Sequence, residues 1–279
     1  MKKKITNILA ILCLCVAVGC ALYLGIYYYK SAKSEKAVSE LSNMIIKTTE
    51  TKKSDEKPIT NLDSADTKSE PNLVNVDGVF VQNKFSSIYR MNRDFLGWLT
   101  IEDTHIDYPV MFTPNDSEHG EFYIHRDFDK NYSAAGLPFV DKNCRVKNPT
   151  DNVIIYGHNM NSGTMFHDII KYENKDFYES HKKFHFDSIY EDAEYEVVAM
   201  FYGEIYDIND TRFKYYQFVN AANEEEFLNF IQEIKKMSII NTGVDVQYGD
   251  HLLTLSTCAY HVEDGRFAVV AKKIESETK

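Results

Sequence analysis

One stretch near the C-terminal end decides the fold of this chain: Leu252-Leu253-Thr254-Leu255-Ser256-Thr257-Cys258. It is a short apolar run with β-branched residues, and this composition indicates a buried strand. A cysteine at the end of such a strand lies on a rigid element and can still reach solvent, which is where a nucleophile belongs. We therefore ask whether the rest of the chain supplies Cys258 with a base, an oxyanion partner and a substrate groove.

Composition limits the classes of protein to consider. The chain has 279 residues, 44% hydrophobic and 26% charged, which is enough for a packed core in one large domain or two small ones. Its formal net charge of −11 argues against a general nucleic-acid binder, which would carry a basic patch. We attribute the acidity to solubility.

The five cysteines do not form a disulfide framework. Cys13, Cys15 and Cys20 lie in an apolar N-terminal segment, and only Cys144 and Cys258 lie in the remainder. No C-x-x-C pair suggests zinc, and we expect no metal and no cofactor. A disulfide between Cys144 and Cys258 would disarm the candidate nucleophile, so we do not expect one.

The N-terminal segment predicts a membrane anchor. Residues 1–4, Met-Lys-Lys-Lys, make a short basic start, and residues 5–29 contain no charged side chain. A helix needs about 20 such residues to cross the hydrocarbon core. The lysines at the start favour a cytoplasmic N-terminus, and four tyrosines near the far end suit an interfacial aromatic belt. We expect a single-pass protein of the cell membrane whose larger part lies outside the cell.

Two other interpretations of this segment exist. A cleaved signal peptide has a shorter apolar core that ends at a small-residue site. Lipidation would use Cys20 in Ala17-Val18-Gly19-Cys20, but the apolar run continues beyond it to Tyr29. We prefer an uncleaved anchor and place lipidation second.

The polarity of the chain predicts its division into four parts. These are a cytoplasmic tail (1–4), a transmembrane anchor (5–29), a polar extracellular stalk (30–75) and a folded domain (76–279). Residues 33–47 have helical spacing of apolar side chains, while residues 48–72 are too polar to bury a core.

The folded domain is expected to be mainly β with helices. A short helix is predicted at 81–92, and residues 94–101 lead into the first strand. Further strands are predicted at residues 106–112, 137–140, 152–156, 195–205, 252–257 and 266–272. Many short strands favour a sandwich or a barrel. A helix is predicted at 223–237, with Asn223 as its cap and Glu226 at the capping-box position.

Among nine histidines, His158 has the best position for a catalytic base. It follows the predicted strand at 152–156, and Gly157 permits a sharp turn before it. His261 is close to Cys258 in sequence, but the local chain would turn it away. His181 and His185 have a spacing that could hold a metal, yet no carboxylate completes such a site, so surface positions are favoured.

Arg266 is the candidate oxyanion partner. If the strands at 252–257 and 266–272 form a hairpin, Arg266 returns beside Cys258. Its guanidinium stays charged and donates parallel hydrogen bonds, which suits an oxyanion or a peptide carbonyl. An ion pair with Glu263 or Asp264 at the surface is an equally weighted alternative.

These residues resemble the motifs of class B sortases. Thr254-Leu255-Ser256-Thr257-Cys258 is similar to their T-L-x-T-C signature, and Tyr156-Gly157-His158-Asn159 is similar to their histidine motif. The resemblance spans residues 79–273, although residues 114–121 match poorly. Three further segments resemble the same class: Met165-Phe166, Asp94-Phe95-Leu96-Gly97-Trp98 and Asp107-Tyr108-Pro109-Val110.

The resemblance implies an eight-stranded β-barrel with an N-terminal helix and a long helix between its sixth and seventh strands. It implies Cys258 as nucleophile, His158 as proton donor and Arg266 as oxyanion or substrate clamp, with Ser256 and Thr257 as substrate-binding positions. The implied substrates are surface proteins with an NPxTx or S/PPxTx sorting signal and a peptidoglycan precursor amine. A secreted cysteine peptidase that only hydrolyses, and a non-enzymatic surface binding module, remain as alternatives.

Overall fold

The computed structural model describes residues 2–55, 72–260 and 262–275, and a closed barrel of eight strands forms its centre. The strands are β3 (Phe95–Thr100), β4 (Asp107–Met111), β5 (Phe139–Val140), β6 (Asn152–Tyr156), β7 (Lys183–Ser188), β8 (Glu194–Glu204), β9 (Leu252–Cys258) and β10 (Gly265–Lys273). They close in the order β10-β8-β7-β3-β4-β5-β6-β9. The predicted eight-stranded barrel is confirmed.

The strand β9 lies between β6 and β10 and is buried on both faces. It pairs in parallel with β6 and antiparallel with β10. Residues 252–257 are all buried, which explains the continuous apolar run, because a strand covered on both sides has no solvent face. The parallel pairing brings the carboxyl ends of β6 and β9 to the same end of the barrel.

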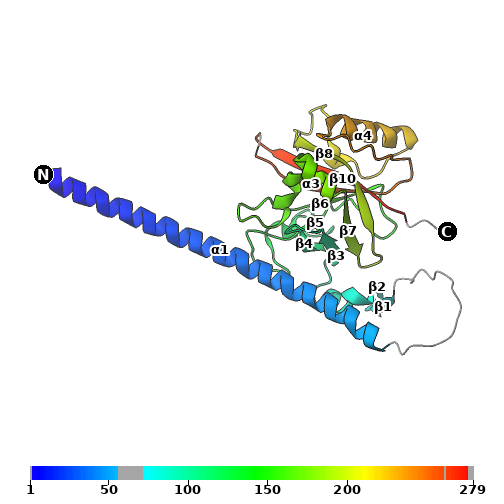
Figure 1. The fold of residues 1–279 in the computed structure, drawn as a ribbon, viewed down its shortest axis with the longest axis horizontal. Helices are drawn as coiled ribbons and strands as arrows, with labels where there is room; N and C mark the ends of the chain where they lie inside the picture. The colour runs from blue at the N-terminus through cyan, green and yellow to red at the C-terminus, as the bar shows by residue number, and fades with distance from the viewer. Residues whose placement is uncertain (1, 56–71, 261, 276–279) are drawn as a thin grey trace.

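The long helix α4 (Glu224–Met237) covers the outside of the barrel near β8 and β10 (Figure 1). Asn223 caps it by accepting the Glu226 N–H at 3.0 Å, and Glu226 accepts the Ala222 N–H at 2.7 Å. The predicted helix is confirmed, and it lies between the sixth and seventh barrel strands. Its inward face carries Phe227, Phe230, Ile231 and Ile234.

One barrel strand is missing from the sequence prediction. In β7, Phe184 and Phe186 are buried while Lys183 and His185 are exposed. Such an alternation is a strand signal, but polar residues outnumber apolar ones, so the segment lacks an apolar run. The strand predicted at 137–140 is shorter in the structure, where only Phe139 and Val140 are extended in the sheet.

The prediction of a helix at 81–92 is wrong for its first residues, which belong to a strand. The structure has a hairpin of β1 (Leu73–Val76) and β2 (Val79–Gln82), followed by η1 (Asn83–Phe85) and α2 (Ser86–Met91). Asp77 and Gly78 form the turn with φ values of 52° and 90°. Asp-Gly favours this kind of hairpin turn. The first strand of the hairpin begins at Leu73, three residues before the predicted start of the folded domain.

The N-terminal helix α1 (Lys2–Asp55) continues far beyond the predicted anchor. Figure 1 shows its first part projecting away from the barrel and its later part lying beside it. Residues 30–57 contain neither glycine nor proline, so nothing in the sequence interrupts the helix. Val38 and Leu41 are each only 6% exposed, so this part of the predicted stalk packs on the domain. Most of the predicted linker at 48–72 lies outside the described residues.

Short helices complete the connections between strands. They are η2 (Phe122–His125), η3 (Phe166–Glu173), α3 (Lys175–Ser180) and η4 (Tyr215–Gln217). Two of them, η2 and η3, flank the chain around His158.

Candidate active site

The predicted neighbours Cys258 and Arg266 lie directly opposite each other. Cys258 ends β9, and in the antiparallel register Arg266 of β10 is its partner. Side chains of directly paired residues share one face of the sheet, with Cβ atoms about 5 Å apart. The hairpin expected from the sequence is therefore confirmed, and it brings the Arg266 guanidinium to the strand end that carries Cys258.

His158 reaches the same place from β6. Tyr156 pairs with Ser256 in the parallel register, and the Gly157 N–H donates to the Ser256 carbonyl at 3.1 Å. The Thr257 hydroxyl then donates to the Gly157 carbonyl at 2.7 Å. These bonds set the main chain at residue 158 level with Cys258, so the strand ends converge as expected.

Gly157 contributes space, which differs from the turn expected of it. A Cβ atom at this position would lie 2.6 Å from the ring of Phe166. Real Cβ atoms do not approach other atoms so closely, so a side chain here would displace the ring or the strand end. The positive-φ glycines do not include Gly157.

Asn159 joins the two strand ends, and the sequence analysis gave it no role. Its Nδ2 donates to the Cys258 carbonyl at 3.0 Å, and its Oδ1 accepts from His167 Nδ1 at 2.8 Å. The side chain is only 8% exposed. Its place directly after His158 was a signal that could have identified it.

The η2 segment supports the imidazole of His158 on one side. His158 Nε2 lies 2.8 Å from the Ile124 carbonyl, and the His158 ring stacks on His125 with centroids 5.3 Å apart. A carbonyl only accepts, so Nε2 carries a proton here and Nδ1 is left for chemistry. Burial lowers the pKa of His158, and His125 lowers it further, while the bond to Ile124 opposes both.

Arg266 is partly buried and is not neutralised by the residues that follow Cys258. Its Nη1 donates to the Gly265 carbonyl at 3.0 Å. Across the described residues, no carboxylate lies within ion-pair distance of its guanidinium, and this includes Glu263 and Asp264. The alternative of a surface ion pair is therefore not observed.

The side chains of the two predicted substrate-binding residues are buried and form hydrogen bonds within the protein. Ser256 and Thr257 are 1% and 2% exposed. The Ser256 hydroxyl lies 2.8 Å from the hydroxyl of Tyr215, and that of Thr257 binds the Gly157 carbonyl. Burial raises the pKa of Tyr215 to about 12, so it is a neutral partner. The assignment of Ser256 and Thr257 as substrate contacts stays a prediction.

The pair His181 and His185 and the second domain cysteine, Cys144, have no contact with Cys258, His158 or Arg266 among the described hydrogen bonds and ring contacts. His181 follows α3 and stacks on Phe177, whereas His185 is exposed on β7. His261 lies outside the described residues. The described part of the chain holds no cluster of three or more metal-ligating side chains. Cys144 is buried and free, and burial raises the pKa of its thiol to about 12, whereas Cys258 is partly exposed.

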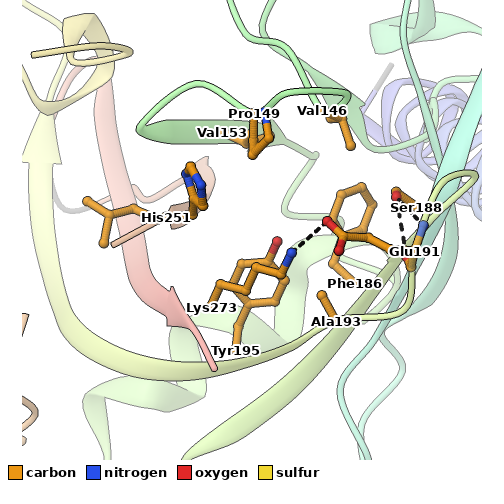
Figure 2. A pocket seen from close by; sticks show the side chains of 11 residues that line it. Val146, Pro149, Val153, Phe186, Ser188, Glu191, Ala193, Tyr195, His251 and Lys273 are labelled. Atoms are coloured by element: carbon orange, nitrogen blue, oxygen red, sulfur yellow. Dashed lines mark hydrogen bonds and ion pairs between the residues drawn. The ribbon is translucent and has the colours of Figure 1, made fainter. Parts of the chain in front are cut away.

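A small cavity lies at the other end of the same strands (Figure 2). Its lining includes Leu252, the first residue of β9, and Lys273, the last of β10. Glu191 pairs with Lys273 at 2.6 Å beside it. The accessible space of about 20 Å³ suits a water molecule rather than a substrate.

Comparison with known proteins identifies this arrangement. The family model "Sortase domain" matches residues 99–274. The chain belongs to the sortase family. Sortase B of Listeria monocytogenes is 33% identical over 202 residues, which cover 72% of this chain and 77% of that protein. Sortase B of Staphylococcus aureus is 32% identical over 197 residues, covering 70% and 76% respectively.

A solved structure agrees with these relatives. The Staphylococcus aureus sortase B–substrate complex aligns with a TM-score of 0.69 and 25% identity, over 89% of this chain and 100% of that one. The chain is therefore a class B sortase, a cysteine transpeptidase that anchors surface proteins. As in sortases generally, its substrates are surface proteins with a sorting signal and a peptidoglycan amine.

Proposed function

We propose that this sortase cleaves a C-terminal sorting signal after a Thr residue, with Cys258 as nucleophile, His158 as proton donor and Arg266 as oxyanion stabiliser. One observation carries the proposal. The ends of β6, β9 and β10 converge in register, so Cys258 faces Arg266 across one pair of strands and adjoins the His158 loop across the other. Nucleophile, acid and cation are then within reach of one peptide carbonyl.

The chemistry follows the order of bond changes. The Cys258 thiolate attacks the Thr carbonyl carbon, and Arg266 stabilises the negative charge that forms on the oxygen. The C–N bond breaks as His158 gives a proton to the leaving amine, so a thioester joins the substrate to Cys258. The amine of the cell-wall precursor then attacks this thioester, and His158, which is now neutral, takes up the proton that the amine loses. A new amide forms, and the thiolate of Cys258 is released.

The proposed address is the cell membrane. Residues 5–29 form the single-pass anchor, with residues 1–4 in the cytoplasm and the catalytic domain outside. Its support is that α1 contains one segment long and apolar enough to span a bilayer, and large apolar side chains of this segment are more than half exposed. Because residues 31–45 belong to the same helix, the polar stretch after the anchor starts as rigid helix.

The sorting pentapeptide is proposed to be of NPxTx or S/PPxTx type. Peptides of both types, incubated with the full chain, should give a covalent adduct that intact mass measurement detects. The adduct should vanish in Cys258→Ala. The proposal is wrong if an adduct still forms in Cys258→Ala, or if the wild-type protein forms no adduct.

Adding an amine separates transpeptidation from hydrolysis. A transpeptidase converts the thioester to the amine conjugate at the expense of the hydrolysed peptide. A cysteine peptidase that only hydrolyses gives the same acid product whether or not the amine is present. A binding module without activity keeps its function in Cys258→Ala.

A further inference from the structure

Three polar contacts join the part of α1 that follows the proposed anchor to the catalytic domain. Ser31 Oγ donates to Ser162 Oγ at 3.2 Å, and Ser42 Oγ donates to Asp107 Oδ2 at 3.4 Å. Between them, Glu35 accepts the hydroxyl hydrogen of Tyr108, with its two carboxylate oxygens at 3.0 and 3.2 Å. Residues spaced three or four apart share one helix face, so these positions form a continuous docking seam.

The Glu35 carboxylate is unusual in this seam. It is partly buried, and in the described chain no cation lies within ion-pair distance of it. Burial raises the pKa of its carboxyl, whereas the bond from Tyr108 acts in the opposite direction. The nearby His105 also lowers this pKa, but less than the Tyr108 bond does. A partly buried carboxylate without an ion-pair partner depends on its hydrogen bonds for stabilisation, and here the Tyr108 hydroxyl supplies one.

The Tyr108 hydroxyl connects Glu35 to the loop of residues 157–165, which carries His158. While donating to Glu35, it accepts the main-chain N–H of Met165 at 3.1 Å. Met165 is fully buried, and its backbone φ angle is 58°. Residues other than glycine rarely adopt a positive φ. Such a conformation costs about 1–3 kcal/mol and persists only where neighbouring contacts hold it.

Met165 closes the loop that carries His158. Asn159 and Met165 form an isolated β-bridge, and the Phe166 N–H donates to the His158 carbonyl at 2.8 Å. The loop of residues 157–165 is therefore pinned at the residue to which Tyr108 binds. Asn159 also holds the Cys258 carbonyl, so one loop sets the positions of both reactive residues.

We propose that Glu35 is a positioning residue for the transpeptidation reaction. Through the Tyr108 hydroxyl it holds the main chain of Met165, and thereby the loop of residues 157–165. The inference rests on the proposed role of His158 in that loop. With this role for Glu35, α1 supports the active site in addition to serving as the proposed membrane anchor. Glu35 itself touches neither substrate nor reacting atoms.

The test uses the full chain in detergent micelles or nanodiscs, with the variants Glu35→Ala, Glu35→Gln and Tyr108→Phe. Glu40→Ala is the matched control, because Glu40 is exposed on the same helix and, among the residues that the structure describes, its carboxylate pairs with Lys36 alone, at 3.9 Å. Two quantities are measured: amide hydrogen exchange at residues 165 and 166, and the acylation rate with its split into kcat and KM.

We expect Glu35→Ala and Tyr108→Phe to speed amide exchange in the loop. Their kcat should fall by roughly ten- to a hundredfold with little change in KM, because misplacement of reacting groups by about 1 Å has this effect. Glu35→Gln keeps an oxygen acceptor for Tyr108 and should restore most of the activity. Glu40→Ala should behave as wild type.

Two results would overturn the inference. One is wild-type exchange and kcat in both Glu35→Ala and Tyr108→Phe. The other is a loss of activity that only follows the unfolded fraction, with loop exchange unchanged relative to the barrel strands. If wild type itself forms no acyl-enzyme, the proposed function fails, while the exchange comparison still decides whether Glu35 holds the loop.

Discussion

Replacing Asn159 by Ala should separate the two strand ends that form the active site. The substitution removes the Nδ2 donor from the Cys258 carbonyl and the Oδ1 acceptor from His167. A typical net hydrogen bond contributes about 1 kcal/mol, and a buried group left without a partner costs about 1–3 kcal/mol. We expect the free energy of unfolding to fall by about 1–3 kcal/mol, which corresponds to a melting temperature lower by roughly 2–12 °C.

The effect on catalysis should exceed the effect on stability. A domain of this size retains most of its stability after such a loss, so the protein stays folded at the assay temperature. A shift of the Cys258 main chain by about 1 Å, however, is enough to slow acyl transfer roughly a hundredfold. Denaturant unfolding gives the first quantity, and single-turnover acylation by a sorting-signal peptide gives the second.

Two further variants show which bond matters. Asn159→Asp keeps an oxygen for His167 but faces the Cys258 carbonyl with a second acceptor, so its acylation should fall at least as far as in the Ala variant. His167→Ala loses only the other bond and should acylate faster than either. Asn143→Ala, at an exposed asparagine, is the control. Wild-type acylation in both Asn159 variants would refute the claim that this amide holds the nucleophile in place.

Three other substitutions probe the same strand ends. Gly157→Ala places a Cβ atom 2.6 Å from the Phe166 ring, so overpacking should lower the free energy of unfolding by about 1–3 kcal/mol in denaturant titrations and slow acylation. His125→Ala removes both a covering ring and a like charge, so the pKa of His158 should rise when the imidazole is titrated by NMR; an unchanged or lower pKa would contradict the stacking argument. Arg266→Lys keeps the charge but loses the planar fork, and steady-state assays should show a kcat lower by roughly a hundredfold or more with a smaller change in KM.

Local signals in the sequence were sufficient for the last two barrel strands. The apolar run before Cys258 and the turn before Arg266 predict a hairpin without knowledge of the rest of the fold, and the structure has it. The helix at Asn223 was equally accessible, because its cap and its apolar stripe are both local. The strand β7 was missed because burial of Phe184 and Phe186 is decided by β3 and β8, its neighbours in the barrel.

The support of the site depends on contacts between distant parts of the chain. Ile124 and His125 come from a connection whose sequence has no apolar period, and nothing in it indicates that they meet His158. The apolar stripe of residues 33–47 was visible, yet its docking surface could not be inferred because Glu35 and Tyr108 are far apart in sequence. Periodicity predicts that an element has a buried face, but only the fold determines which surface covers it.

The parallel pairing of β6 and β9 explains why this site needs the whole barrel. In an antiparallel pair, the end of one strand lies beside the start of the other, so two residues that each follow a strand would lie at opposite ends. Here both strands run the same way, and Gly157 and Ser256 continue the ladder to the point where His158 and Cys258 emerge. Because two strands of the barrel, β7 and β8, and the helix α4 separate β6 from β9 along the chain, their register is set only when the barrel closes. Substitutions in buried strand positions far from Cys258, such as Leu253 or Val153, should therefore reduce acylation more than their effect on stability accounts for, since a shifted register moves Cys258 and His158, the proposed nucleophile and acid, apart.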